Sequence, residues 1–160
     1  MTDFFKHAAA RDLPKYLFRT FHNGSFNQYD KDEGISSGDP SIWIGNWDEA
    51  HEALSDHMDV FNRSSPTPFV SVYKDRRKAK ELAERCLERG DEGVTIAIIY
   101  VRKWKKEWWR VLEIDPALDY CQIRLPTQAA IDATESECLV YGGIPRGVIR
   151  LVPAEEFYLS

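Results

Sequence analysis

Hydrophobic and polar positions follow two different periods along the chain, which indicates a mixture of strands and helices. Short runs rich in β-branched, aromatic and aliphatic residues predict about six strands, over 16–21, 69–73, 94–101, 108–114, 137–141 and 147–152. The run over 94–101 is apolar on both faces, so we expect a central strand covered on both sides. A strand or a short helix is expected over 120–132, and an irregular connection over 23–41.

Two segments have apolar residues at helical spacing. In the first, Asn46 can cap a helix and Glu49 lies three positions later, as in a capping box, so we predict a helix over 47–61. A second helix is predicted from the cap residue Asp75 to Gly90. Together these elements predict a single α+β domain over residues 1–160, built on antiparallel strand pairs.

Composition and charge narrow the possible functions. The 160 residues carry 21 basic and 26 acidic side chains, and the resulting net charge of −5 disfavours a passive role in coating nucleic acid. No apolar run approaches the roughly 20 residues of a spanning helix, and the first residues lack the apolar region of a signal peptide. We therefore expect no membrane passage, and both a cytoplasmic protein and a secreted effector stay open.

The three cysteines form no CxxC pair, and the four histidines are scattered along the chain. This spacing indicates neither a disulfide framework nor a zinc site, because metal sites need clustered ligands. We expect no metal, and the sequence does not define an oligomeric state.

The most basic segment is 102–110 (RKWKKEWWR), which holds five cations and three tryptophans. Interleaved cations and aromatic rings are typical of proteins that bind single-stranded nucleic acid. The simpler interpretation, favoured by the acidic balance of the chain, is a hairpin whose loop is solvated by lysines while Trp108 or Trp109 packs in the core.

Polar residues also lie on or beside the predicted strands. Arg19 interrupts the apolar strand 16–21, where a guanidinium either faces solvent or holds a phosphate or carboxylate. Ser71, taken alone, is more typical of a hydrogen-bonded core serine. Glu135 and Glu137 precede an apolar strand, and in an extended chain they would share one face about 7 Å apart. Like charges that close are costly unless a cation, solvent or a substrate uses them.

In their order along the chain these residues resemble the Arg–Ser–Glu class of mono-ADP-ribosyltransferases, which contains cholera toxin, heat-labile enterotoxin and the pierisins. The segments that carry the resemblance span residues 16–152 and read YLFRTF, FVSVYKDRRKA, VTIAIIYV, WRVLEID and ESECLVYGGIPRGVI. The most specific of them is the ExE motif followed by GGIP. The chain is also similar to fungal proteins that carry the same set of motifs.

The resemblance implies the ADP-ribosyltransferase fold, with two packed, mainly antiparallel sheets, flanking helices and NAD bound as substrate between the sheets. It implies transfer of ADP-ribose to a protein side chain, with arginine as one candidate acceptor and NAD hydrolysis as a side reaction. Glu137 matches the catalytic glutamate, and Glu135 the first motif position, where a glutamate accompanies arginine acceptors. Arg19 matches the strand arginine that holds NAD, and Ser71 the first serine of the Ser-Thr-Ser motif.

Three positions in two segments depart from the family's pattern. The middle motif reads SVY at 71–73, and Tyr73 offers a ring that could pack against nicotinamide. Phe21 stands where the family often has an acidic residue, with His22 beside it as a polar substitute. The alternative is therefore a catalytically degenerate domain of the same fold that acts as a binding module. Modification of nucleic acid is disfavoured because Glu135 is not a glutamine.

Overall fold

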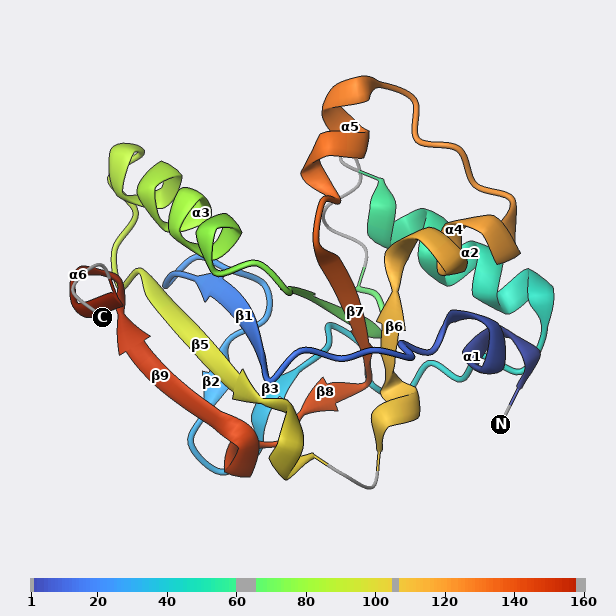
Figure 1. The fold of residues 1–160 in the computed structure, drawn as a ribbon, viewed down its shortest axis with the longest axis horizontal. Coiled ribbons are helices and arrows are strands. Elements are labelled where there is room, and N and C mark those ends of the chain that lie inside the picture. The colour runs from blue at the N-terminus through green and yellow to red at the C-terminus, as the bar shows by residue number, and fades with distance from the viewer. Residues whose placement is uncertain (1, 60–65, 105–106, 158–160) are drawn as a thin grey trace.

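A six-stranded antiparallel sheet forms the centre of the computed structural model, which describes residues 2–59, 66–104 and 107–157 (Figure 1). In spatial order its strands are β6 (Val111–Glu113), β7 (Glu137–Tyr141), β4 (Phe69–Tyr73), β1 (Tyr16–Phe21), β5 (Thr95–Tyr100) and β9 (Ile149–Pro153). A second antiparallel sheet contains the short strands β2 (Tyr29–Asp30), β3 (Gly34–Ser36) and β8 (Gly143–Ile144). The α+β class with two antiparallel sheets is thereby confirmed.

Helices lie at both ends of the large sheet (Figure 1). They are α1 (Asp3–Ala8), α2 (Trp47–Met58), α3 (Arg76–Glu88), α4 (Ile114–Cys121), α5 (Gln128–Ala133) and α6 (Ala154–Phe157). Both predicted caps are confirmed: the Asn46 side chain accepts a hydrogen bond from the backbone N–H of Glu49, and the Asp75 side chain accepts one from Arg77. No helix within the described ranges has the length and apolar character needed to cross a membrane.

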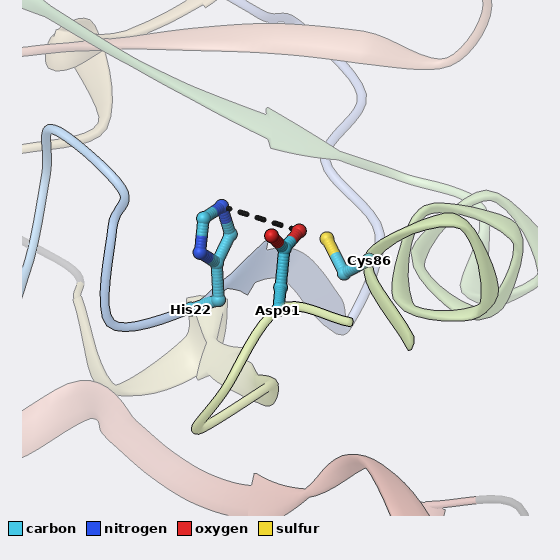
Figure 2. A group of neighbouring side chains, drawn as sticks. All are labelled: His22, Cys86 and Asp91. Atoms are coloured by element: carbon cyan, nitrogen blue, oxygen red, sulfur yellow. Dashed lines mark ion pairs between the residues drawn. The ribbon is translucent and has the colours of Figure 1, made fainter. Parts of the chain in front are cut away.

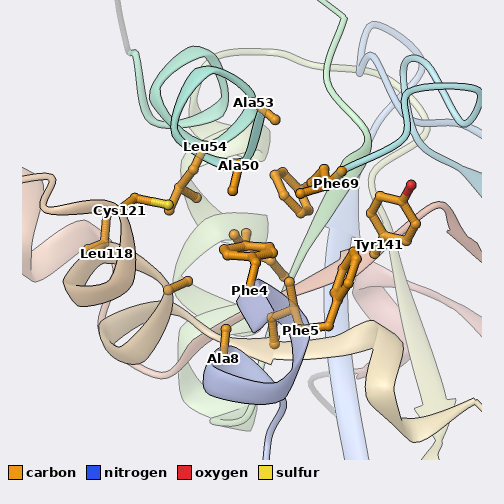
Figure 3. Packing of buried hydrophobic residues seen from close by; sticks show 14 of the residues in the cluster. Phe4, Phe5, Ala8, Ala50, Ala53, Leu54, Phe69, Leu118, Cys121 and Tyr141 are labelled. Carbon is orange, nitrogen blue, oxygen red and sulfur yellow. The ribbon is translucent and has the colours of Figure 1, made fainter. Parts of the chain in front are cut away.

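Apolar clusters cover both faces of the large sheet. Between the two sheets, Ile35 of β3 and Ile144 of β8 pack with residues of β1, β4, β5 and β7. On the opposite face α3 and α6 cover β1 and β5. Beside them α1, α2 and α4 enclose an aromatic cluster that includes Phe4, Phe5 and Phe69 (Figure 3). The helix-covered face therefore carries two separate apolar clusters. Polar residues occupy the ends of β4 and β7 that lie between these clusters.

The predicted hairpin around 102–110 is wrong. β5 and β6 are separated in the large sheet by β1, β4 and β7, so the segment between them crosses the sheet instead of folding back. Residues 108–110 form a 3-10 turn, which leaves only Val111–Glu113 as strand, and Ile114 already belongs to α4. Likewise β9 pairs with β5 and not with β7, the strand predicted before it in the sequence. Apolar patterning identifies strands but does not tell which of them pair.

Short elements account for the remaining differences. The helices α1, α4 and α6 were not expected as separate elements, and the connection over 23–41 contains β2 and β3. The strand or short helix expected over 120–132 is represented by the helix α5, which covers only the end of that range. Helices of four to eight residues carry too little periodic pattern to stand out in a sequence. The predicted end of the first helix, including Phe61, lies outside the described residues.

Candidate functional site

Three neighbouring strands, β1, β4 and β7, bring Arg19, Ser71 and Glu137 together. β4 and β7 pair along their length, with Ser71 opposite Leu139 and Tyr73 opposite Glu137. β1 and β4, in contrast, share a single register position, so the two strands separate beside Ser71. Arg19 uses this separation, since its Nη1 donates a 2.9 Å hydrogen bond to the backbone carbonyl of Ser71.

The Ser71 hydroxyl lies at the centre of a chain of hydrogen bonds. Its Oγ is 2.8 Å from Nε2 of His57, and Nδ1 of the same ring is 2.7 Å from Oγ1 of Thr67. Glu137 lies on the neighbouring strand, two residues along from Leu139, the register partner of Ser71, and the Ser71 side chain lowers the pKa of its carboxyl. For Ser71 to donate to an ionised Glu137, Thr67 must donate to His57 and His57 to Ser71. Each bond in such a chain polarises the next and stabilises the negative charge at its end.

Glu137 is buried, with 7% of its surface exposed. Burial raises the pKa of its carboxyl to about 7, against the opposing effects of Lys78, the Ser71 hydrogen bond and Arg19. Near neutral pH the group therefore divides between its acid and carboxylate forms. A carboxyl group balanced in this way is suited to a site where positive charge develops during a reaction.

His57 is neutral at physiological pH, because burial and the nearby Arg19 lower the pKa of its ring to about 4. It comes from the last turn of α2, and its ring packs edge-on against Phe69. The residue pattern of this stretch predicts only an amphipathic helix and does not indicate His57 as a site residue. No signal near His57 could have revealed it, because its partner Ser71 lies on a different element.

The Arg19 guanidinium has few hydrogen-bond partners for a charged group. Nη1 binds the Ser71 carbonyl, and Nη2 lies 3.5 Å from Oδ1 of Asn27. The buried Nε has no hydrogen-bond partner among the described residues. Burial lowers the pKa of Arg19 to about 10, which still leaves it charged at neutral pH; Tyr73 and Glu137 act in the opposite direction. An arginine with a buried, unpaired N–H has the geometry to accept an anion such as a phosphate.

Tyr73 and Lys78 complete the surroundings of Glu137. The Tyr73 hydroxyl keeps its proton, because burial and the neighbouring Glu137 raise its pKa above the usual range. Lys78, from α3, lies 6.0 Å from the centre of the Tyr73 ring. Two of the predicted family departures can now be separated: Tyr73 shares the face of Ser71, whereas Val72 points into the core between the sheets.

Glu135 lies in a turn and not in the strand. The residue between the two glutamates, Ser136, has a φ of 60°, and β7 begins only at Glu137. The expected extended arrangement of the ExE motif is therefore wrong, because a left-handed residue separates an exposed Glu135 from a buried Glu137. Both glutamates nevertheless line one pocket of about 340 Å³.

The pocket that contains the two glutamates is strongly acidic. Its single lysine, Lys74, already lies 3.5 Å from Glu113 in an ion pair. The other charged residues of the lining are Asp115, Asp132, Glu135 and Glu137. A pocket with this charge favours a cationic group next to Glu137.

His22 lies apart from these residues. Its Nδ1 accepts a hydrogen bond from the backbone N–H of Gly24, and its Nε2 is 3.7 Å from Oδ2 of Asp91 (Figure 2). The His22 side chain thus points toward the loop before β5, and His22 does not belong to the group formed by Arg19, Ser71 and Glu137.

The basic segment 102–110 offers few free rings. Trp104 is buried, and Trp109 packs against Phe5 and Tyr141. Packing of Trp109 confirms one part of the simpler interpretation, although the hairpin itself does not form, and the lysines at 105 and 106 lie outside the described ranges.

Taken together, the fold is an α+β domain whose large antiparallel sheet carries a buried group of hydrogen-bonded polar side chains on adjacent strands. The chain matches the family model described as a domain of unknown function (DUF7587) over residues 12–152, and it belongs to that family. No curated protein matches the sequence.

Proposed function

We propose that this domain is a mono-ADP-ribosyltransferase that moves ADP-ribose from NAD to a protein side chain, and that its sheets have the ADP-ribosyltransferase arrangement. The observation that supports this most is the convergence of Arg19, Ser71 and Glu137 from β1, β4 and β7. These are the three residues that match the family's motif, and they come from strands far apart in sequence.

The residues suit the chemistry that such a transfer needs. Cleavage of the bond between nicotinamide and ribose leaves the electron pair on nicotinamide and positive charge on the ribose ring, as in glycoside hydrolysis. A Glu137 carboxylate, held by Ser71, is placed to stabilise that charge and to accept a hydrogen bond from a ribose hydroxyl. The unpaired Nε of Arg19 offers a donor for a phosphate oxygen of the substrate.

The altered middle motif is compatible with activity. Val72 is fully buried in the core between the sheets, so the loss of a hydroxyl there does not reach Glu137. Tyr73 replaces the third position on the face of Ser71, and its neutral hydroxyl lies beside the carboxylate instead of competing with it as an anion. We therefore favour an enzyme over a degenerate binding module.

The acidic pocket beside Glu137 supports a cationic acceptor such as an arginine side chain. Attack of the acceptor nitrogen on the ribose carbon forms the new bond and releases one proton, which Glu135 can take as general base. When no acceptor is bound, water attacks instead and the products are ADP-ribose and nicotinamide. Glu135→Gln should therefore reduce transfer to a small guanidine such as agmatine by at least about tenfold while water-dependent nicotinamide release continues.

Release of nicotinamide from NAD by the purified protein tests the proposal, with Glu137→Gln as the decisive variant. We expect the variant to lose at least about 100-fold in turnover while it keeps NAD binding, because only the charge that stabilises the transition state is removed. Glu155→Gln is the control, since Glu155 is an exposed carboxylate on α6. NAD binding without turnover in the wild type would favour the binding module, and turnover retained by Glu137→Gln would refute the assignment.

A further inference from the structure

A second cluster of side chains lies at the C-terminal end of β1, where three segments of the chain meet. His22 directly follows β1, Cys86 belongs to the last turn of α3, and Asp91 lies in the loop before β5 (Figure 2). One ligand-type atom from each of the three residues lies within 4.8 Å of the other two. We propose that His22 Nε2, Cys86 Sγ and an Asp91 carboxylate oxygen form a three-ligand site for Zn²⁺.

The donor set fits zinc. Nitrogen, sulfur and oxygen donors from histidine, cysteine and aspartate are the usual ligands of Zn²⁺, and three protein ligands leave a fourth position for water. Two donors on a tetrahedral zinc lie about 3.4–3.6 Å apart, given the usual bond lengths. The cluster therefore needs to contract by about 1 Å, which side-chain rotation can supply.

The backbone already holds the three segments together. The N–H of Asp91 donates to the carbonyl of Cys86 at 3.0 Å, and the N–H of Asn23 donates to the carbonyl of Glu92 at the same distance. The ligands are thus brought close by main-chain hydrogen bonds, and binding does not have to assemble the site from separate parts.

A cation already occupies part of this cluster. Arg89 donates to Oδ2 of Asp91 at 2.8 Å and to Sγ of Cys86 at 3.4 Å, so both atoms face positive charge without any metal. The Arg89 side chain is 61% exposed, and it can swing into solvent at little cost when a metal takes its place. Arg89 therefore competes with the metal for the same two atoms.

His22 must change its tautomer to act as a metal ligand through Nε2. Nδ1 accepts from Gly24 N–H, so in the neutral ring Nε2 carries the proton and points toward Asp91. Metal binding moves that proton to Nδ1 and turns the exposed Gly24 N–H to solvent, at a cost of about one hydrogen bond. The turn itself survives, because Ser25 keeps its hydrogen bonds to the His22 backbone. Cys86 binds as the thiolate and releases its proton to solvent.

Titration with Co²⁺, a spectroscopic substitute for Zn²⁺, tests the site directly. We expect one Co²⁺ per chain, with a near-ultraviolet thiolate-to-cobalt band that Zn²⁺ abolishes by displacement. Cys86→Ser should remove the band, and His22→Asn or Asp91→Asn should weaken binding at least about tenfold, as expected when a ligand is lost. The matched controls Cys121→Ser and His7→Asn should bind as the wild type does.

Arg89→Ala gives the opposite and most specific result. Removal of the competing guanidinium should tighten Zn²⁺ binding about two- to fivefold, the value of an exposed ion pair. The proposal is overturned if no thiolate band forms, if the band persists in Cys86→Ser, or if Arg89→Ala weakens binding. Should Cys86→Ser fail to fold, Asp91→Asn at a partly exposed position decides the question alone.

Discussion

The same face of the same two strands is apolar at one end and polar at the other. On β4 and β7 this face carries Phe69 and Tyr141 at the end covered by α1, and Tyr73 and Glu137 at the other end. His57 marks the boundary, since its ring packs on Phe69 while its nitrogens bind Thr67 and Ser71. Apolar burial at the first end stabilises the fold, whereas a buried carboxylate at the second end opposes it.

The polar end of this strand pair is where we propose that the function of the domain resides. A strand pair that could have continued its apolar face instead buries a group whose ionisation is costly, which is the pattern expected where chemistry is selected at the expense of stability. Substitutions in the apolar end should therefore lower the free energy of unfolding. Replacement of the buried carboxyl at the polar end should raise the free energy of unfolding and lower activity.

The largest expected effect concerns the aromatic end. Phe5 is 1% exposed and packs against Phe4 and Tyr141 (Figure 3). It also contacts Trp109, so Phe5→Ala should lower the free energy of unfolding by about 3–5 kcal/mol through lost burial and a cavity. Denaturant unfolding measures this loss. Phe26→Ala is the control, because Phe26 is 74% exposed and should change stability by less than about 0.5 kcal/mol. Equal effects of the two substitutions would contradict the assigned core.

A substitution at the polar end, Glu137→Gln, should change the free energy of unfolding in the opposite direction. The pKa of Glu137 is raised from 4.5 to about 7 in the fold, so its ionisation destabilises the protein as pH rises through this range and has its full effect above pH 7. Glu137→Gln should therefore raise the free energy of unfolding by about 1–3 kcal/mol at pH 8 and by almost nothing at pH 4, where the carboxyl is neutral in both states.

The pH dependence must be taken as a difference between wild type and variant. His57, whose pKa is lowered to about 4, contributes stability that is lost as pH falls from 6.5, so its effect opposes that of Glu137 in an overlapping range. Thermal unfolding of both proteins at pH 4 and pH 8 isolates the carboxylate. A variant that is less stable at pH 8 would show that Glu137 is a stabilising ion-pair partner.

A smaller effect is expected for His57→Asn. His57 acts through Ser71, so we expect turnover to fall about tenfold, near the lower end of the effect of a lost catalytic hydrogen bond. The apparent pKa in the profile of kcat/KM should also rise, because the hydrogen bond that lowers the pKa of Glu137 is weakened. Lower turnover with an unchanged pH profile would reduce His57 to a structural role.

The smallest effect is expected at Asn27, whose Oδ1 is 3.5 Å from Arg19. Asn27→Ala should raise the KM for NAD about two- to threefold and leave kcat unchanged, since it removes one weak contact that orients the guanidinium. Steady-state kinetics separate the two constants. A fall in kcat alone would mean that Asn27 acts on the reaction itself and not on substrate binding.

The long elements could be predicted from the sequence, but the way in which they are joined could not. The strands that carry Arg19 and Ser71, and both helix caps, follow from local patterns and are confirmed. The hairpin around 102–110 failed because strand pairing is decided by contacts distant in sequence.

The site was predictable only where a motif existed. Glu137 and Ser71 lie close together through the pairing of β4 with β7, and their proposed roles stay predictions. The left-handed conformation of Ser136, which separates Glu135 from the strand, could not be recognised in the sequence. His57 was invisible because a histidine at the end of an amphipathic helix carries no sign of a partner on another strand. The cluster around His22 was missed for the same reason, since its three residues are far apart in the chain.

The most direct test of the account is the pH dependence of kcat/KM for nicotinamide release from NAD by the wild-type protein. Because the carboxylate form of Glu137 is required, we predict a rate that rises with unit slope from pH 5 and levels off above an apparent pKa near 7. A rate that is independent of pH between 5 and 8, or the absence of release at every pH, would contradict the account.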